Sequence, residues 1–251
     1  MKQIDVKKRI RKLLLRAREI SREKGIYSVV RSGVKITVNW LVNYLCYCYY
    51  RKIKWAEIFT FQGKTYRYFY HRYNHTWKNE RAVEIPIIWA YLKKYHARRT
   101  LEVGNVLSHY FRVNHDIIDK YEKADGVINK DIVDFKPLKK YDLIVSISTL
   151  EHVGWDENPR EPVKILHAIE NFKNLLSPGG TAIATVPLGY NSEMDELLKE
   201  RKTKFTKQYY LKRITKNNKW IEAGWDDVCD AKYGEPFPNA SALVIGIIVR
   251  K

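Results

Sequence analysis

The stretch at positions 101–119, LEVGNVLSHYFRVNHDIID, decides the fold of this 251-residue chain. It contains two short apolar runs, each of which predicts a β-strand. Glu102 stands two positions before Gly104 at the end of the first run, and Asp119 closes the second. An acidic residue just before a glycine at a strand end is typical of the nucleotide-binding turn of an α/β sheet, because glycine lets the backbone approach a ligand closely.

Further strands and helices alternate along the rest of the chain, and this alternation predicts a parallel sheet with helical crossovers. Pro86 is expected to kink or restart the first helix, and Pro178-Gly179-Gly180 to end the second. A hairpin is expected within 55–73, around Gln62-Gly63. The expected strands are 101–103, 116–118, 143–146, 181–186 and 243–249, and the expected helices are 80–96 and 162–176.

The carboxylates that follow these strands suggest a nucleoside site. Asp119 at the end of the second strand can accept hydrogen bonds from both hydroxyls of a ribose. Glu122 is a competing candidate, and a solvent-exposed Asp119 is the plain structural alternative. Asp131 can accept from an adenine amino group while Ile132 covers the ring.

The buried strand that begins near Tyr141 delivers three polar side chains, Ser148, Glu151 and His152, at its carboxyl end. In an open α/β sheet, ligands lie outside the carboxyl ends of the strands. These side chains are therefore expected to face the same ligand as the first turn.

Taken in order, these features resemble class I S-adenosylmethionine (SAM) dependent methyltransferases. The resemblance covers about residues 79–190 and is greatest to small-molecule methyltransferases that carry Glu-His-Val after the fourth strand, here at 151–153. It also includes Leu-Leu-Ser-Pro-Gly-Gly at 175–180. It implies an α/β fold with a Rossmann-like, seven-stranded, mostly parallel sheet whose last strand is antiparallel.

The resemblance implies SAM as the cofactor and assigns residues to each part of it. Arg81 would pair with the SAM carboxylate, although a solvated arginine at a helix end is an open alternative. One departure concerns the family's Gly-x-Gly-x-Gly pattern, since Val106 and Ser108 replace its second and third glycines, which leaves a cofactor-free relative as an alternative. The other assignments are Glu102, Gly104 and Asn105 at the methionine end, Asp119 at the ribose, Asp131 and Ile132 at the adenine, and Ser148 at the floor.

Methyl transfer to a hydroxyl needs a base aligned with the acceptor. The resemblance places His152 near the transferred methyl group, and histidine titrates near neutral pH. Glu151 is the second catalytic candidate, and His109 is a weaker one. The alternative is that His152 only makes a hydrogen bond within its loop. Aromatic side chains are expected to build the acceptor pocket, namely Tyr66, Tyr70, Tyr73, Trp77 and Tyr190.

The positive charge of the chain is confined to its first part. Residues 1–100 contain 24 Lys and Arg against 6 Asp and Glu, whereas residues 101–251 contain 22 of each. We therefore predict a basic amphipathic helical extension at 1–54, with helices at 1–24 and 33–50, and a methyltransferase domain at 55–251, with 55–78 as a hairpin or lid. Such an extension suits an anionic membrane surface, and packing on the domain is the alternative.

The sequence therefore predicts a methyltransferase that O-methylates a glycan, a lipid-linked sugar or another small molecule. An RNA methyltransferase that uses the basic arm, and a non-catalytic binding protein, are the alternatives. The three cysteines lack Cys-x-x-Cys spacing, so neither a zinc site nor a disulfide framework is expected. We expect a cytoplasmic protein that is peripheral at the inner membrane face, because 34–50 is shorter than the ~20 apolar residues of a spanning helix.

Overall fold

The computed structural model describes residues 6–96 and 98–251. Up to residue 30 it describes only the side chains of residues 11, 15, 27, 28 and 30. The chain divides into two compact units, Met1–Tyr49 and Tyr50–Lys251. The apolar stripe expected in the basic helix lies outside the described side chains, at Ile10, Leu13, Leu14 and Ala17.

Helix α1 (Val6–Lys52) is one continuous helix where the sequence predicted two helical segments. It ends in the basic residues Arg51 and Lys52, which complement the partial negative charge of a helix C-terminus. Within the part of the chain that the structure describes, no helix is both long and apolar enough to cross a membrane.

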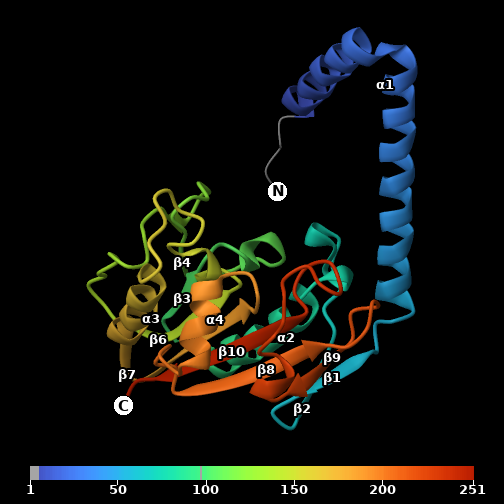
Figure 1. Cartoon of the computed structure of the whole chain (residues 1–251). Coiled ribbons are helices and arrows are strands. Elements are labelled where there is room, and N and C mark those ends of the chain that lie inside the picture. Colours follow the sequence, from blue (N-terminus) through green and yellow to red (C-terminus); the bar gives the residue numbers. More distant parts are fainter. Residues whose placement is uncertain (1–5, 97) are drawn as a thin grey trace. The chain divides into compact units, whose positions relative to one another are not determined.

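The second unit is built on an eight-stranded sheet of order β5-β4-β3-β6-β7-β10-β8-β9 (Figure 1). The first five strands in this order are parallel, and β10 runs antiparallel between β7 and β8. The mostly parallel sheet with an antiparallel last strand is confirmed, but the predicted count of seven is one too low because β9 extends the edge. The bounds are β3 Thr100–Val103, β4 Asp116–Ile118, β5 Val127–Ile128, β6 Tyr141–Ile147, β7 Leu176–Pro187, β8 Lys207–Arg213, β9 Trp220–Ala223 and β10 Ala242–Val249.

Two apolar layers cover the two faces of this sheet. Successive side chains of a strand point to opposite faces. Accordingly, Leu143 and Val145 pack with α2 and the β1–β2 hairpin, whereas Ile144 packs with α3 and α4. The sheet is therefore buried on both sides and holds its carboxyl edge in a fixed position. The covering elements are β1 Ile58–Phe61, β2 Lys64–Arg67, α2 Arg81–Lys94, α3 Lys164–Leu175 and α4 Ser192–Lys199.

The predicted hairpin is confirmed, since β1 and β2 pair antiparallel around Gln62 and Gly63. Both turn residues have positive φ, 49° and 67°, as a tight hairpin turn requires. Phe59 and Phe61 are buried on its inner face. A role for this hairpin as a lid stays a prediction.

Pro86 lies inside α2 without interrupting it, whereas the sequence predicted a kink or a restart. Proline has no N–H, so it leaves the carbonyl of Ala82, four residues earlier, without its helical partner. The backbone N–H of Phe69 donates to that carbonyl at 2.9 Å. The segment after the hairpin thus replaces the missing hydrogen bond and keeps the helix continuous.

The Pro178-Gly179-Gly180 segment is also placed differently from the prediction. Helix α3 ends at Leu175, and these three residues belong to the start of β7. The register between β6 and β7 shifts here, and Gly179, with φ of 74°, donates its N–H to the carbonyl of Arg250. The segment is therefore an irregular strand start that is held by the chain's last residues.

Candidate functional site

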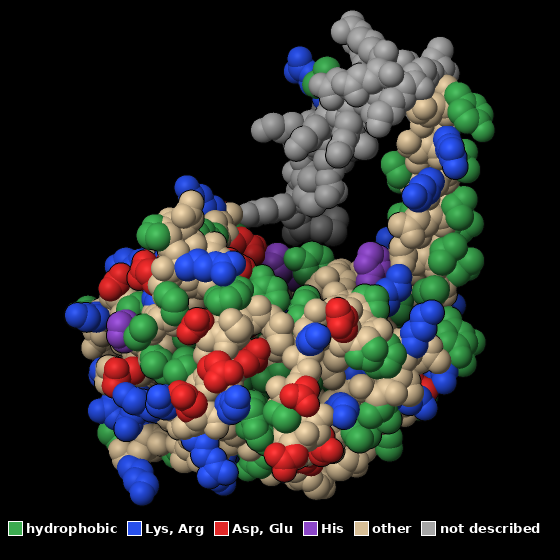
Figure 2. Space-filling model, in the orientation of Figure 1, with side chains coloured by type: hydrophobic (Ala, Val, Ile, Leu, Met, Phe, Trp, Pro, Cys, Tyr) green, Lys and Arg blue, Asp and Glu red, His purple; other side chains and the backbone are tan. Residues whose placement is uncertain are grey.

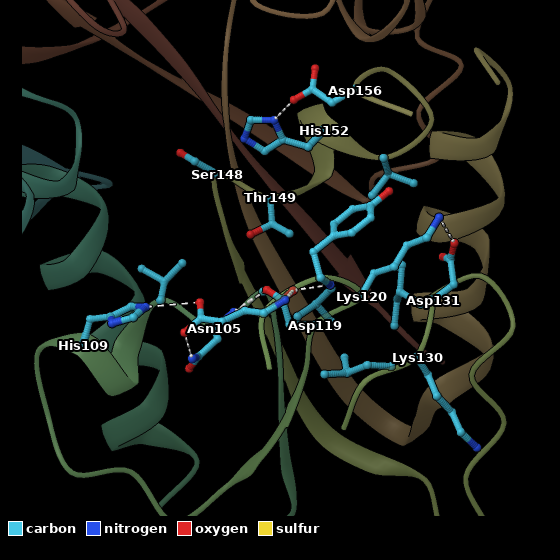
Figure 3. Close-up of a pocket in the computed structure, with 18 of the residues that line it drawn as sticks. Asn105, His109, Asp119, Lys120, Lys130, Asp131, Ser148, Thr149, His152 and Asp156 are labelled. Atoms are coloured by element: carbon cyan, nitrogen blue, oxygen red, sulfur yellow. Dashed lines mark hydrogen bonds and ion pairs between the residues drawn. The ribbon is translucent and has the colours of Figure 1, made fainter. Parts of the chain in front are cut away.

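A cavity of about 760 Å³ opens at the carboxyl ends of β3, β4 and β6 (Figure 3). Its walls come from the turn after β3, the segments after β4 and β6, and the start of α2. The structure thus brings together residues that lie up to 84 positions apart, from Tyr73 to Glu157. Eight of the ten sequence-predicted site residues line this cavity, namely Arg81, Gly104, Asn105, Asp119, Asp131, Ile132, Ser148 and His152.

Glu102 does not line the cavity, although it was expected at the methionine end. Its side chain is fully buried beneath the turn that follows β3. Its Oε1 accepts the backbone N–H groups of Val106 and Leu107 at 2.9 and 2.7 Å, and its Oε2 lies 2.8 Å from Nε2 of His115. Glu102 therefore shapes the turn from below, because it accepts the buried N–H of Leu107 and shares that of Val106 with the carbonyl of Gly104, 3.1 Å away.

Gly104 occupies a position where any side chain would collide. Its φ is 86°, and a Cβ atom there would lie 2.1 Å from Oγ1 of Thr149, which also lines the cavity. The two residues that replace glycines in this turn, Val106 and Ser108, do not close the cavity. Val106 forms part of its wall, and Ser108 is exposed and does not line it. Leu107 between them is fully buried in the core that contains α2.

Asp119 connects the turns after β3 and β4. Its Oδ2 accepts the backbone N–H of Asn105 at 3.1 Å, and its Oδ1 accepts those of Tyr121 and Glu122 at 2.8 and 2.7 Å. A carboxylate oxygen has two lone pairs, so Oδ2 keeps capacity for a ligand hydroxyl. Glu122, the competing candidate, is held by Asn105 Nδ2 at 2.8 Å and by His109 Nε2 at 3.3 Å.

Asp131 belongs to a ring of alternating charges that sequence reasoning did not find. Its Oδ2 lies 3.0 Å from Lys120 Nζ and 2.8 Å from Lys164 Nζ, and both lysines also contact Glu157. Burial opposes the ionisation of Asp131, but the two lysines lower its pKa below the usual value overall. This carboxylate is thus largely engaged by protein groups, and Ile132 beside it presents an apolar surface to the cavity.

His152 forms a hydrogen-bonded pair with Asp156 at the cavity wall (Figure 3). The Nδ1 atom of His152 lies 2.6 Å from Oδ2 of Asp156, which also accepts the hydroxyl of Tyr190 at 2.9 Å. Burial and the hydrogen bond to Asp156 raise the pKa of Tyr190 to about 12, so its hydroxyl stays protonated and donates. The sequence analysis missed Asp156, whose only signal was its distance of four residues from His152 in a segment with no helical pattern.

A buried charged layer lies behind the wall formed by Arg81 and Ser148. The guanidinium of Arg81 is paired with Glu84, and the hydroxyl of Ser148 donates to the same carboxylate at 2.6 Å. Glu151 is 2% exposed and does not line the cavity, and its catalytic role stays a prediction. Burial raises the pKa of Glu151 well above its usual range.

The aromatic acceptor pocket is only partly as expected. Tyr73 lines the cavity and stacks on His109 with ring centroids 4.6 Å apart. Tyr190 stands edge-on to His152, with 4.9 Å between the centroids. Of the five expected rings, only Tyr73 lines the cavity; Tyr66, Tyr70, Trp77 and Tyr190 do not, and Trp77 is 3% exposed.

Comparison with known proteins gives likenesses in structure but not in sequence. No family model and no curated protein matches the chain. The N-methyltransferase NodS from Bradyrhizobium japonicum, in complex with S-adenosyl-L-homocysteine, is 12% identical over 68% of this chain and 87% of that chain, with a TM-score of 0.44. A SAM-dependent methyltransferase from Clostridium acetobutylicum (11% identity, 65% and 89% covered, TM-score 0.35) and TehB from Haemophilus influenzae (16%, 72% and 65%, 0.38) are also similar.

Proposed function

We propose that this chain is a SAM-dependent methyltransferase that methylates a hydroxyl group of a glycan, a lipid-linked sugar or another small molecule. The observation that carries the proposal is the His152–Asp156 pair in the wall of a cavity that also holds Asp119 and Ile132. A positioned base and a nucleoside-type site in one cavity suit the removal of a hydroxyl proton during group transfer.

The residues of the cavity fit SAM in size and chemistry. A volume of about 760 Å³ lies within the usual range of small-molecule sites, roughly 300–1,000 Å³. Apolar side chains of Val103, Ile118 and Ile132 offer a surface for a purine ring, and Asp119 Oδ2 offers a lone pair to a ribose hydroxyl. When bound, SAM supplies an electrophilic methyl group on a sulfonium centre.

His152 acts as the general base in this proposal. Asp156 accepts a hydrogen bond from Nδ1–H, which fixes the tautomer that leaves the lone pair on Nε2. Nε2 would take the proton of an acceptor hydroxyl whose oxygen displaces the thioether of SAM from the methyl group, so that the methyl–sulfur bond breaks as the methyl–oxygen bond forms. Tyr190 donates to Asp156 and holds the carboxylate in place. Tyr190 and Tyr233 continue the aromatic surface beyond His152, with centroids 5.2 Å apart, and such rings pack well on sugars.

We also propose that α1 and the residues just after it rest on an anionic membrane surface, at the inner face. Residues 24–56 contain no Asp or Glu. Figure 2 shows hydrophobic and basic side chains interspersed along the described part of this helix. Trp and Tyr favour the headgroup level of a bilayer, while Lys and Arg are drawn to anionic lipids. Exposed side chains recur at intervals of three or four residues on one face, namely Tyr27, Val30, Val34, Val38, Leu41 and Leu45.

Vesicle flotation tests this membrane proposal. The full chain should float with vesicles that contain phosphatidylglycerol and much less with pure phosphatidylcholine. Leu41→Asp, on the apolar face, should reduce flotation strongly. Asn39→Asp is the matched control, because it changes the charge equally but lies 200° around the helix from Leu41 at about 100° per residue. Equal loss in both variants, or binding without lipid preference, would count against the apolar face as the contact.

Transfer of label from tritiated SAM tests the enzyme itself. A membrane fraction that contains lipid-linked glycans should gain label that survives mild base and ribonuclease, as a methyl ether does. His152→Asn should lower the rate roughly 10²- to 10⁴-fold, the usual contribution of a general base. His167→Asn, on the exposed side of α3, is the control. Ribonuclease-sensitive label would favour an RNA methyltransferase, and no label in any fraction would favour a non-catalytic protein.

A further inference from the structure

Three buried carboxylates share one guanidinium behind the cavity wall. Glu80, Glu84 and Glu151 are 7%, 0% and 2% exposed, and Arg81 is the arginine among them. If all three carboxylates were ionised, they would outnumber the guanidinium groups of Arg81 and of the buried Arg213, which also interacts with Glu80. An uncompensated negative charge would then lie away from water, which is costly. At least one of these groups must therefore hold a proton in the free protein.

The three carboxyl groups of the layer differ in how many hydrogen-bond donors they have. Glu84 accepts from both Arg81 and Ser148, and Glu80 accepts the backbone N–H of Ala240 at 3.2 Å. The Oε2 atom of Glu151 is buried and has no hydrogen-bond partner among the described residues. A protonated carboxyl tolerates such a place better than a carboxylate, so Glu151 is the group that holds a proton most readily.

The surroundings of Glu151 connect it to the cavity. Its Oε1 lies 3.8 Å from Nε2 of His152, and the His152 side chain is 45% exposed. The imidazole therefore offers a path by which a proton can pass between the buried carboxyl and water. The ionisable groups that face Glu151 are Glu80, Arg81 and Glu84 of α2, His152 of its own turn, and Tyr190 and Tyr233 from the loops beyond β7 and β9.

We propose that Glu151 is protonated in the free protein and ionises when the cationic methyl donor binds, so that the protein prefers SAM to its neutral thioether product. This inference rests on the proposed function, which places the reacting methyl group beside His152 and so places the sulfonium charge near Glu151. The carboxyl proton passes to water, and the carboxylate that remains attracts the sulfonium from behind the cavity wall. Product formation removes that positive charge, and the carboxyl takes a proton again.

The expected preference for SAM over S-adenosylhomocysteine follows from the charge of the sulfonium alone. A unit charge within about 6–8 Å at an effective dielectric constant near 20 favours the opposite charge by on the order of 10- to 100-fold. SAM should therefore bind roughly 10- to 100-fold more tightly than S-adenosylhomocysteine at a pH where Glu151 is protonated in the free protein only. Since binding favours the ionised form, affinity for SAM should rise with pH through this range, while affinity for the product should stay nearly constant.

Titration calorimetry of the full chain in two buffers with different ionisation enthalpies tests the proposal. At one pH, the enthalpy of SAM binding should differ between the buffers and report the release of up to about one proton. S-adenosylhomocysteine should show no such difference. Glu151→Gln should bind SAM without proton release, and because the donor's own amino group is unchanged, its protonation cancels in the comparison with the parent protein.

Glu80→Gln is the matched control, since it removes a buried carboxyl of the same layer whose oxygen is supported by Ala240. It should keep the proton release. Release that disappears in Glu80→Gln but persists in Glu151→Gln would overturn the assignment, as would equal enthalpies in both buffers for the parent protein. If neither nucleoside binds, the proposed function itself fails, whereas binding without proton release overturns this inference alone.

Discussion

Glu102 and Glu151 are two buried glutamates at the carboxyl ends of neighbouring parallel strands, and they differ in their hydrogen-bond partners. Glu102, in β3, receives two backbone N–H groups and an imidazole. Glu151, just beyond β6, has an oxygen for which the described residues supply no partner. The same side chain at the same edge of the sheet is thus fully satisfied in one place and unsatisfied in the other.

This difference in hydrogen bonding gives the two glutamates different roles, since one supports the backbone and the other can respond to a nearby charge. A buried carboxylate that accepts several hydrogen bonds is held in a single state, and it fixes the backbone that donates to it. A buried carboxyl without partners can change its protonation when a nearby charge changes. We therefore assign Glu102 to the shape of the turn and Glu151 to the electrostatics of the ligand.

Removal of Glu102 should have the largest effect. Glu102→Ala leaves the N–H of the buried Leu107 without an acceptor, at about 1–3 kcal/mol, and removes hydrogen bonds from Val106 and His115, at about 0.5–1.5 kcal/mol each, so the free energy of unfolding should fall by about 2 kcal/mol or more. Urea denaturation measures this change. Glu102→Gln keeps one acceptor oxygen and should cost less. A loss below about 0.5 kcal/mol in Glu102→Ala, as for an ordinary surface change, would break the comparison.

Gly104 tests the same turn from its other side. Gly104→Ala combines positive φ with a Cβ placed 2.1 Å from Thr149 Oγ1, so we expect a loss of about 1–3 kcal/mol together with weaker nucleoside binding. Thr149→Ala in the Gly104→Ala background should recover part of the loss, because it removes the atom in closest conflict. Full stability of the single variant, measured by thermal denaturation, would show that the turn has more room than this geometry allows.

His152 lies between the buried Glu151 and Asp156, whose side chain is exposed to water, so Asp156 extends the comparison to an exposed carboxylate. Asp156→Asn should lower kcat roughly 10- to 100-fold, as the loss of an orienting partner does at other sites, with KM little changed. Asp226→Asn, in an exposed 3-10 turn, is the control. An unchanged kcat in Asp156→Asn would leave Asp156 with a structural role only.

Glu151→Gln should have the smallest effect on stability, and it should stabilise the protein, whereas Glu102→Ala and Gly104→Ala should destabilise it. Because burial raises the pKa of Glu151 above its ordinary value of 4.5, the unfolded chain ionises first as pH rises. The contribution of Glu151 to stability is fully present below the ordinary pKa of 4.5, and it is lost as pH rises through the raised pKa of the folded state. Glu151→Gln should therefore raise Tm at pH 8 relative to the parent protein, by about 2–4 °C for each kcal/mol regained, and change it little at pH 4. A lower Tm at pH 8 would show that Glu151 is ionised and stabilising.

The strands that carry the site could be predicted because their signals are local. The apolar runs of β3, β4 and β6 and the turn at Gly104 lie within short stretches of sequence. The antiparallel last strand followed from the family resemblance. Strands β8 and β9 could not be found, since their residues alternate only partly. Their place depends on pairing, of β8 with β10 and of β9 with β8.

The side-chain network around the site was beyond the sequence for a similar reason. Lys164 meets Asp131 across 33 positions, and Ser148 meets Glu84 across 64. Such contacts depend on how crossovers return to the sheet edge, which no local pattern records. Glu102 was assigned to the ligand because a strand-end acid can serve either a ligand or its own turn, and only the fold decides between the two.

A crystal structure of the protein with S-adenosylhomocysteine tests the central claim most directly. We predict that the nucleoside occupies the cavity at the ends of β3, β4 and β6, with its ribose at Asp119 and its adenine against Ile132. An empty cavity at millimolar nucleoside, or a ligand bound elsewhere on the protein, would contradict the account.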